Sequence, residues 1–297
     1  MRAEDPIRLY LDPDQRRQVQ TGRHNFLGHV IGALDDRGHR IEIRDDDDAG
    51  LLASAATPGR ALFHMHPPTT PQGLTFRLAY HFPFWRIERT AERWNFDVAR
   101  KSFDPESTDL AIARQFAARA RRRLFGLDGD PPPPGDTVLI VLQGQLLSRR
   151  SFQDSSPMDM IRRTLTALPG AKVRISLHPS ETYSPDEIEA LRDTIAPHVN
   201  ARVAERRAIE LLPEARLVVT QNSAVALTGF FFHRPAVLFA RSDFHHIAAR
   251  DVDSALSDPP DFDRYLHWFL QDNAINAGAP DVRDQILRRL ADHGWRI

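Results

Sequence analysis

The stretch TVLIVLQ, from Thr137 to Gln143, is the clearest strand signal in this sequence. Its unbroken apolar core is typical of a strand that is buried on both faces in a parallel sheet. The residues behind it repeat the pattern, with apolar strands expected at 173–178, 216–222 and 235–240. Helical segments separate these strands, and alternation of this kind predicts a doubly wound α/β layer.

The N-terminal part of the chain shows the same rhythm. Strands are expected at Ile7–Leu11, Arg40–Arg44 and Ala61–Met65, and apolar residues within Gly22–Gly38 recur at helical intervals. Strand, helix and strand in this order begin a second α/β layer. The sequence therefore predicts an α/β protein with two Rossmann-like lobes, parallel sheets and a cleft between the lobes.

A proline-rich segment, GLDGDPPPPGD, separates the two halves. It cannot continue the basic helix expected at Leu110–Phe125, because consecutive prolines favour a stiff, extended chain. We therefore predict an N-terminal lobe at 1–125, a linker at 126–136 and a C-terminal lobe at 137–297, the last closed by two helices.

The composition excludes several classes of function. The chain of 297 residues has no cysteine, so thiol catalysis, disulfides and cysteine metal sites are excluded. Acidic and basic residues nearly cancel, at 40 and 39, so no overall charge favours nucleic acid. The first residues lack the apolar core of a signal peptide, and no apolar run reaches the roughly 20 residues that span a bilayer. A cytoplasmic location is expected.

Polar residues follow three of the expected C-terminal strands. These are Gln143-Gly144-Gln145, His178-Pro179 and Gln221-Asn222-Ser223. In an open parallel sheet, ligands bind outside the carboxyl ends of the strands. The start of the helix after Asn222 and Ser223 offers unpaired N–H groups to a phosphate, and His178 could donate to one. An ordinary helix cap and a strand-end histidine are the alternatives.

The order of these motifs resembles that of bacterial capsule polysaccharide biosynthesis proteins, which include Kdo transferases. The shared features are a glutamine-bearing loop with Gln145, the acid Asp154, a strand ending in His178-Pro179, and a strand followed by Asn222-Ser223, a helix and Arg-Pro-Ala-Val. They cover roughly residues 138–246.

This resemblance implies a metal-independent glycosyltransferase of the GT-B type that uses a CMP-activated sugar. It places His178 and Pro179 on the cytidine nucleotide and Asn222 and Ser223 on its phosphate, with Gln145 beside them. Asp154 is a catalytic candidate by the same likeness. The expected partners are a nucleotide-sugar donor and a glycan or glycolipid acceptor, with peripheral association to a membrane assembly complex. No cofactor and no nucleic acid are expected.

The N-terminal lobe would then supply the acceptor site and a base. His24 is the predicted base, flanked by Arg23 and Asn25 at the start of the first long helix. The aromatic and basic segment Tyr80–Arg86 suits stacking on sugar rings, with Arg86 as an acceptor contact. The same segment suits packing between the two lobes equally well.

Two other functions stay open. His64 and His66 could serve a metal-dependent hydrolase, together with His178 or with Asp243, His245 and His246. The chain could also be a non-catalytic nucleotide-sugar-binding member of an assembly complex. Two acidic Asp-X-Asp patterns, at 12–14 and 128–130, and the run Asp45–Asp48 are interpreted as solvated turns or loops.

Overall fold

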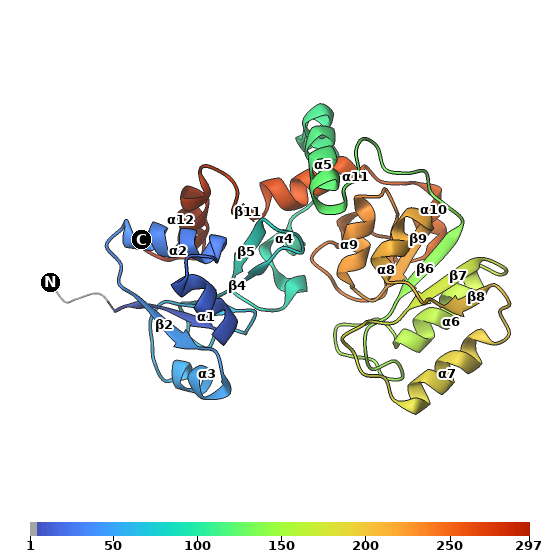
Figure 1. The fold of residues 1–297 in the computed structure, drawn as a ribbon, viewed down its shortest axis with the longest axis horizontal. Coiled ribbons are helices and arrows are strands. Elements are labelled where there is room, and N and C mark those ends of the chain that lie inside the picture. Colours follow the sequence, from blue (N-terminus) through green and yellow to red (C-terminus); the bar gives the residue numbers. More distant parts are fainter. Residues whose placement is uncertain (1–4) are drawn as a thin grey trace. The chain divides into compact units, whose positions relative to one another are not determined.

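The computed structural model describes residues 5–297 and divides into two compact α/β units (Figure 1). Unit 1 comprises the chain up to Lys101 together with Phe269–Ile297, and unit 2 comprises Ser102–Trp268. Each unit has its own sheet, which confirms the predicted α/β class.

The sheet of unit 1 has six strands in the order β11-β5-β4-β3-β1-β2. Its strands are β1 (Ile7–Leu11), β2 (Ile41–Asp45), β3 (Ala61–His64), β4 (Gly73–Leu78), β5 (Phe84–Glu88) and β11 (Ile275–Asn276). Strands β2, β1, β3 and β4 run parallel, as predicted, whereas β5 and β11 pair antiparallel. The sheet is therefore mixed: a short connection between β4 and β5 reverses the chain, and β11 is added at the edge by the returning C-terminal segment.

Helices α2 and α12 cover one face of this sheet and pack side by side (Figure 1). Phe26, Leu27, Val30 and Leu34 recur at helical spacing on α2 and are buried in the same core as Leu290 of α12. The helices of unit 1 are α1 (Pro13–Gln20), α2 (Asn25–Asp35), α3 (Asp48–Ala55), α4 (Asp97–Arg100) and α12 (Val282–Asp292).

The sheet of unit 2 has five parallel strands in the order β10-β9-β6-β7-β8. They are β6 (Thr137–Val141), β7 (Lys172–Ser176), β8 (Ala201–Val203), β9 (Ala215–Thr220) and β10 (Ala236–Leu238). All of β6 is buried, as its apolar run predicts. The chain moves outward from β6 in one direction to β8 and then in the other to β10, so the strand order reverses between β6 and β9. A reversal of this kind is the usual ligand position in doubly wound folds.

The helices of unit 2 connect and cover these strands. They are α5 (Leu110–Phe125), α6 (Pro157–Ala167), α7 (Pro185–Ile195), α8 (Ala208–Leu211), α9 (Ala224–Phe230), α10 (Val252–Ser257) and α11 (Phe262–Leu266). A π-helical turn, His267–Asp272, follows α11. No helix within residues 5–297 has both the length and the apolar character that a membrane span requires.

The structure divides the chain at other positions than the proline segment. Helix α5 belongs to unit 2, where it packs on α11 and where Arg121 pairs with Asp263 at 2.9 Å. The proline segment is also held in unit 2, because the buried Arg234 donates to the carbonyl oxygens of Pro132 and Pro133. The last residues, with β11 and α12, complete the sheet and core of unit 1.

Candidate functional site

The carboxyl ends of β6 and β9 carry buried amide side chains with unsatisfied hydrogen-bonding groups. Gln221, directly after β9, is fully buried; its Nε2 donates to Ser155 O at 3.1 Å, and its Oε1 has no partner among residues 5–297. Gln143 Oε1, after β6, is also buried and unpaired within this range. A buried polar atom without a partner costs about 1–3 kcal/mol, so such a group points to a ligand or water.

The loop at 150–156 contributes two more unpaired groups to the same edge of the sheet. Gln153 is 4% exposed; its Oε1 accepts from Arg150 N at 2.8 Å, while its Nε2 and the Ser155 hydroxyl have no partner in the described chain. The loop is fixed against the end of β10 by a bridge between Gln153 and Ala240. Gln153 and Ser155 were not singled out from the sequence, where the only signal was the polar composition of this loop.

Asp154 lies in this loop with its side chain exposed. Its carboxylate pairs with Arg250 at 3.1 Å, and its backbone N–H donates to Phe239 O at 2.7 Å. The structure therefore places this predicted catalytic residue beside the buried amides of the switch point, on the carboxyl side of β10. Its role in catalysis stays a prediction.

Gln145 follows β6 in a tight turn and is exposed, with a φ of 62°. Two acidic residues that follow β7 lie against this turn. Glu187 accepts from Leu146 N at 2.5 Å, and a Cβ on Gly144 would lie 2.2 Å from Glu181 Oε2. A side chain at Gly144 would require Glu181 to move, and the turn holds the Gln145 side chain at the surface.

Asn222 and Ser223 lie between β9 and α9, as predicted. Ser223 is the N-cap of α9, and its Oγ accepts from Val225 N at 3.3 Å. Asn222 Nδ2 donates to Arg241 O at 3.0 Å. Ser223 thus makes the local contact that a helix start requires, whereas Asn222 is bonded to the segment that follows β10. Contact of either side chain with a phosphate stays a prediction.

His178 and Pro179 follow β7 and are exposed. The His178 Nδ1 accepts from Ser180 N at 3.2 Å, and the His178 backbone N–H donates to the Tyr183 hydroxyl at 2.8 Å. Because Nδ1 acts as an acceptor, the neutral ring carries its proton on Nε2. The Nε2–H takes no part in the hydrogen bond between Nδ1 and Ser180, so His178 can donate it to a bound anion.

His24 has a structural partner that the sequence did not reveal. It is the N-cap of α2; its Nδ1 accepts from Leu27 N at 3.2 Å, and its ring lies 5.4 Å from that of Trp85. Burial lowers the pKa of His24. A general base needs a free lone pair, and the neutral ring in this tautomer has none, so the geometry does not support His24 as the base.

The three residues predicted to bind the acceptor contact different parts of unit 1. Arg23 is exposed and donates to Thr21 Oγ1 at 3.0 Å, and Asn25 Nδ2 donates to Ala277 O at 3.0 Å. Arg86 is only 3% exposed; it donates to Phe269 O at 3.0 Å and lies over the Phe269 ring. Arg86 is thus packed within unit 1, and its contact with an acceptor is a prediction that this geometry does not favour.

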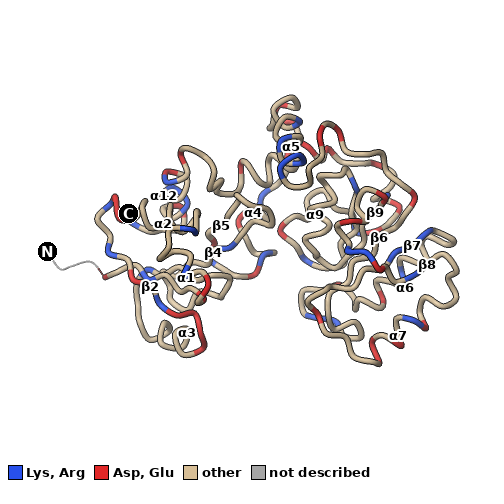
Figure 2. The backbone as a smooth tube through the Cα atoms, in the orientation of Figure 1, with Lys and Arg blue, Asp and Glu red and all other residues tan. Residues whose placement is uncertain are grey.

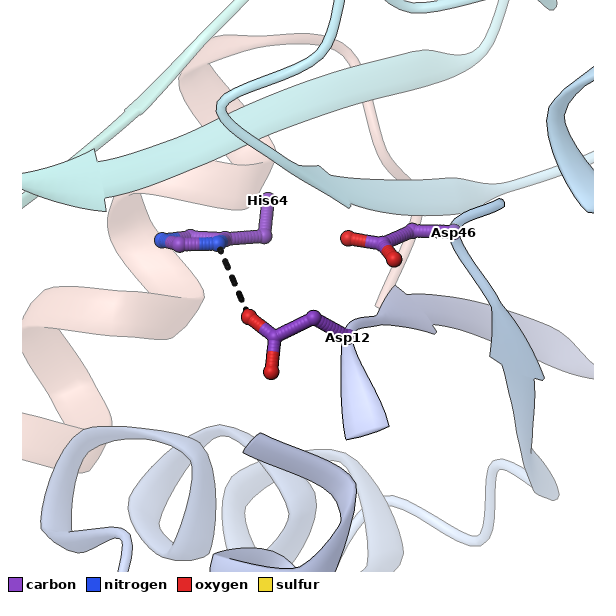
Figure 3. A group of neighbouring side chains, drawn as sticks. All are labelled: Asp12, Asp46 and His64. Atoms are coloured by element: carbon purple, nitrogen blue, oxygen red, sulfur yellow. Dashed lines mark ion pairs between the residues drawn. The ribbon is translucent and has the colours of Figure 1, made fainter. Parts of the chain in front are cut away.

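Unit 1 has its own cluster of polar groups at the carboxyl ends of β1, β2 and β3. Asp12, Asp46 and His64 point toward one another, with Asp12 Oδ2 at 3.9 Å from His64 Nδ1 (Figure 3). Burial lowers the pKa of His64 to about 4. Asp12 and Asp46 were interpreted as parts of solvated turns; both in fact follow strands of a parallel sheet, which was the signal that could have identified them.

The other histidines of the hydrolase alternative make different contacts. His66 lies beyond β3, with its Nε2 at 3.7 Å from Asp46 Oδ2. In unit 2, His245 Nδ1 lies 2.8 Å from Ser242 O and His246 Nδ1 lies 3.1 Å from the Tyr265 hydroxyl. The groups of potential metal ligands found in residues 5–297 contain none of these three histidines. They also contain neither Asp243 nor His178.

Comparison with known proteins gives a likeness of fold without a likeness of sequence. No protein-family model and no curated protein matches the chain. Among solved structures, the β-Kdo 2,7 transferase of Thermosulfurimonas dismutans KpsC aligns over 97% of this chain and 99% of its own, with a TM-score of 0.54 and 10% identity. The β-Kdo 2,4 transferase of KpsC aligns over 88% of each chain, with a TM-score of 0.46 and 14% identity.

A third structure, the UDP-GlcNAc 2-epimerase of Neisseria meningitidis, aligns over 95% of this chain and 83% of its own, with a TM-score of 0.31 and 12% identity. The likeness to the 2,7 transferase spans nearly the whole of both chains and therefore includes both α/β units. The resemblance predicted from the motifs of unit 2 is confirmed at the level of fold: this chain has the fold of the KpsC β-Kdo 2,7 transferase.

Proposed function

We propose that this protein is a GT-B-type glycosyltransferase of surface or capsular polysaccharide biosynthesis. It would transfer an acidic sugar, with Kdo as the first candidate, from a CMP-activated donor to a glycan or glycolipid acceptor. The observation that carries the proposal is the set of buried, unpaired amides at the switch point of unit 2, in a chain that shares its fold with a Kdo transferase. We further propose a cytoplasmic location with peripheral association to a membrane assembly complex.

The donor is assigned to unit 2. The side-chain amides of Gln221 and Gln153 offer both a donor and an acceptor to the edge of a cytosine ring, which presents the same two kinds of group. The exposed Nε2–H of His178 and the polar groups of Asn222 and Ser223 would hold the phosphate, with Pro179 against the nucleotide and Gln145 near the sugar. No metal ion is required for these contacts.

The transfer itself needs a group that accepts a proton. An acceptor hydroxyl oxygen forms the new bond to the anomeric carbon, the bond from that carbon to the phosphate oxygen breaks, and CMP leaves with the electron pair. The only lone pair of the neutral His24 ring already accepts the hydrogen bond that caps α2. We therefore propose that the exposed carboxylate of Asp154 accepts the proton of the acceptor hydroxyl. Arg23 and Asn25 remain the proposed acceptor contacts of unit 1, whereas Arg86 is left out because it is buried against Phe269.

Nucleotide binding is the first test. Titration calorimetry with CMP, CDP, UDP and GDP should show CMP as the tightest ligand. Gln221→Ala and His178→Ala should each weaken CMP at least tenfold, because each removes a hydrogen bond to a desolvated or charged group. His198→Ala is the matched control, since His198 precedes β8 and lies at the amino end of its strand. Failure of every nucleotide to bind would overturn the proposal.

Transfer is tested separately, by incubating CMP-activated sugars with candidate glycan acceptors and measuring the release of CMP. We expect Asp154→Asn to bind CMP with near-normal affinity and to lose at least a hundredfold in turnover, the usual contribution of a general base. Binding of CMP without turnover of any donor would instead identify a non-catalytic nucleotide-binding protein.

A further inference from the structure

Three neighbouring parallel strands of unit 1 bring an oxygen, an oxygen and a nitrogen ligand to one place. Asp12 follows β1, Asp46 follows β2 and His64 ends β3, and β1 lies between the other two strands in the sheet. The strand order reverses between β1 and β3, so the cluster lies at the switch point of the unit 1 sheet. Figure 3 shows the three side chains converging from these separate segments.

The distances within the cluster suit a bound cation. The nearest ligand atoms of the three residues all lie within 4.8 Å of one another, and Asp12 Oδ2 is 3.9 Å from His64 Nδ1. Two ligands at about 2.1 Å from one metal ion lie up to about 4 Å apart, so small side-chain rotations bring all three into range. His66 Nε2 lies 3.7 Å from Asp46 Oδ2 and is therefore close to one of the three ligands only.

The carboxylates of this cluster have no arginine or lysine ion-pair partner within residues 5–297. A second cluster in unit 1, formed by Glu88, Asp97 and His293, does have such a partner. There Arg289 contacts Glu88 at 2.7 Å and Asp97 at 2.9 Å, so a guanidinium already neutralises the acids. Among residues 5–297, the basic groups that pair with Asp12 and Asp46 are the imidazoles of His64 and His66.

A buried residue that is hydrogen-bonded to Asp12 also has an unsatisfied polar atom. Gln15, whose backbone N–H donates to Asp12 Oδ1 at 2.8 Å, is 8% exposed, and its Oε1 has no partner in the described chain.

We propose that Asp12, Asp46 and His64 form a binding site for a divalent transition cation, with Zn²⁺ as the first probe. A mixed set of imidazole and carboxylate ligands suits Zn²⁺ or Mn²⁺, whereas Mg²⁺ and Ca²⁺ take oxygen ligands. The site goes beyond the proposed transferase function and does not depend on it. The cation would link the ends of three strands and neutralise the negative charge of the two carboxylates.

The experiment uses the full, untagged chain after treatment with a chelator, in the absence of any nucleotide. Calorimetry with Zn²⁺, Mn²⁺, Mg²⁺ and Ca²⁺ should show one Zn²⁺ or Mn²⁺ bound per chain, with Mg²⁺ and Ca²⁺ at least tenfold weaker. The substitutions Asp46→Asn and His64→Ala should each weaken the transition metal at least tenfold, and Co²⁺ should give a visible absorption band that both variants lose.

Controls separate this site from general binding to surface histidines and acids. Asp45→Asn changes the neighbouring acid, which pairs with Arg16, and His29→Ala removes a histidine of α2; both should bind the metal normally. Circular dichroism should show that each variant is folded. Preference for Mg²⁺ or Ca²⁺, absence of one-to-one binding, or unchanged affinity in the double variant Asp46→Asn/His64→Ala would overturn the proposal. None of these results depends on nucleotide binding or turnover.

Discussion

Arg234 shows how one buried side chain fixes a segment that has no secondary structure. It is fully buried, and its guanidinium lies within hydrogen-bond distance of four backbone carbonyls, those of Pro132, Pro133, Leu212 and Pro213. Because prolines have no N–H, this segment cannot pair with a sheet as an ordinary strand would. Its carbonyls accept hydrogen bonds from the arginine instead. The extended proline segment is thereby held against unit 2.

Replacing this arginine should be costly. Arg234→Met keeps much of the volume but leaves buried carbonyls without a donor, so we expect a loss of about 3 kcal/mol in unfolding free energy. Urea unfolding of the full chain measures it. The control is Arg207→Ala, which removes an exposed pair with Glu210 and should change stability by less than about 1 kcal/mol. Equal losses in both variants would contradict the role given to Arg234.

His81 should make the stability of unit 1 depend on pH. Burial lowers the pKa of His81 to about 4, from 6.5 in an unfolded chain. Below pH 6.5 the unfolded state therefore binds a proton that the folded state excludes, and stability falls as the pH drops toward 4. The shift corresponds to about 3 kcal/mol over that window.

The variant His81→Gln should show a flatter profile between pH 6.5 and 4 in urea unfolding followed by intrinsic fluorescence. The difference between variant and wild type isolates this histidine from the others. At pH 8 the imidazole is neutral in both states, so the difference there reports only packing and hydrogen bonding. A variant profile parallel to that of the wild type across the whole window would refute the assignment.

Among the helices, α5 shows why an element can be predicted correctly and still be assigned to the wrong part of the fold. Its length and basic character agree with the sequence, and its arginines are visible in Figure 2. Its buried residues are Ala113, Ala117 and Arg121, a narrow stripe of small side chains around one arginine. That stripe packs on α11, where Arg121 meets Asp263.

The start of α5 depends on one capping residue. Asp109 accepts from the backbone N–H groups of Ala111 and Ile112 at 2.8 and 3.0 Å, and its charge lies at the positive end of the helix. We expect Asp109→Ala to lower the unfolding free energy by about 1 kcal/mol in denaturant titrations. Asp130→Ala, an exposed acid in the proline segment, should have no measurable effect. An equal effect at both positions would contradict the capping role.

At the scale of the whole molecule, the chain crosses from unit 1 to unit 2 and then returns. Residues 269–297 supply β11, which pairs with β5, and α12, whose Ile286 and Leu290 are buried in the core with α2. Unit 2 is continuous, from Ser102 to Trp268. A C-terminal lobe drawn from 137 to 297 would therefore lack α5 and carry two elements that belong to the other sheet.

Two fragments test this division. Residues 102–268 should fold alone and give a cooperative unfolding transition, because all strands of the unit 2 sheet and its covering helices are present. Residues 137–297 should be aggregated or partly unfolded, because Asp263 loses Arg121 and the apolar face of α12 loses its core. Circular dichroism and gel filtration distinguish the two. A well-folded 137–297 fragment beside an unfolded 102–268 fragment would overturn the division.

The sequence by itself determined the α/β class, most of the strands and which polar residues follow them. These features are local: a run such as TVLIV at β6 reports burial on both faces, and the side chain of Ser184 or Ser223 accepts a hydrogen bond from a backbone N–H in the first turn of the next helix. The positions of Gln143, His178 and Gln221 at strand ends follow directly from such runs. Even the likeness to capsule transferases rested on the order of these local signals.

Only the tertiary structure decided which of these residues are neighbours. Asp12, Asp46 and His64 are far apart in the sequence and meet because β1 lies between β2 and β3. The contact of the His24 ring with Trp85, and the return of α12 to unit 1, depend on packing that no local pattern encodes. The physical reason is that periodicity and capping act over a few residues, whereas strand order and core packing are set by contacts across the whole chain.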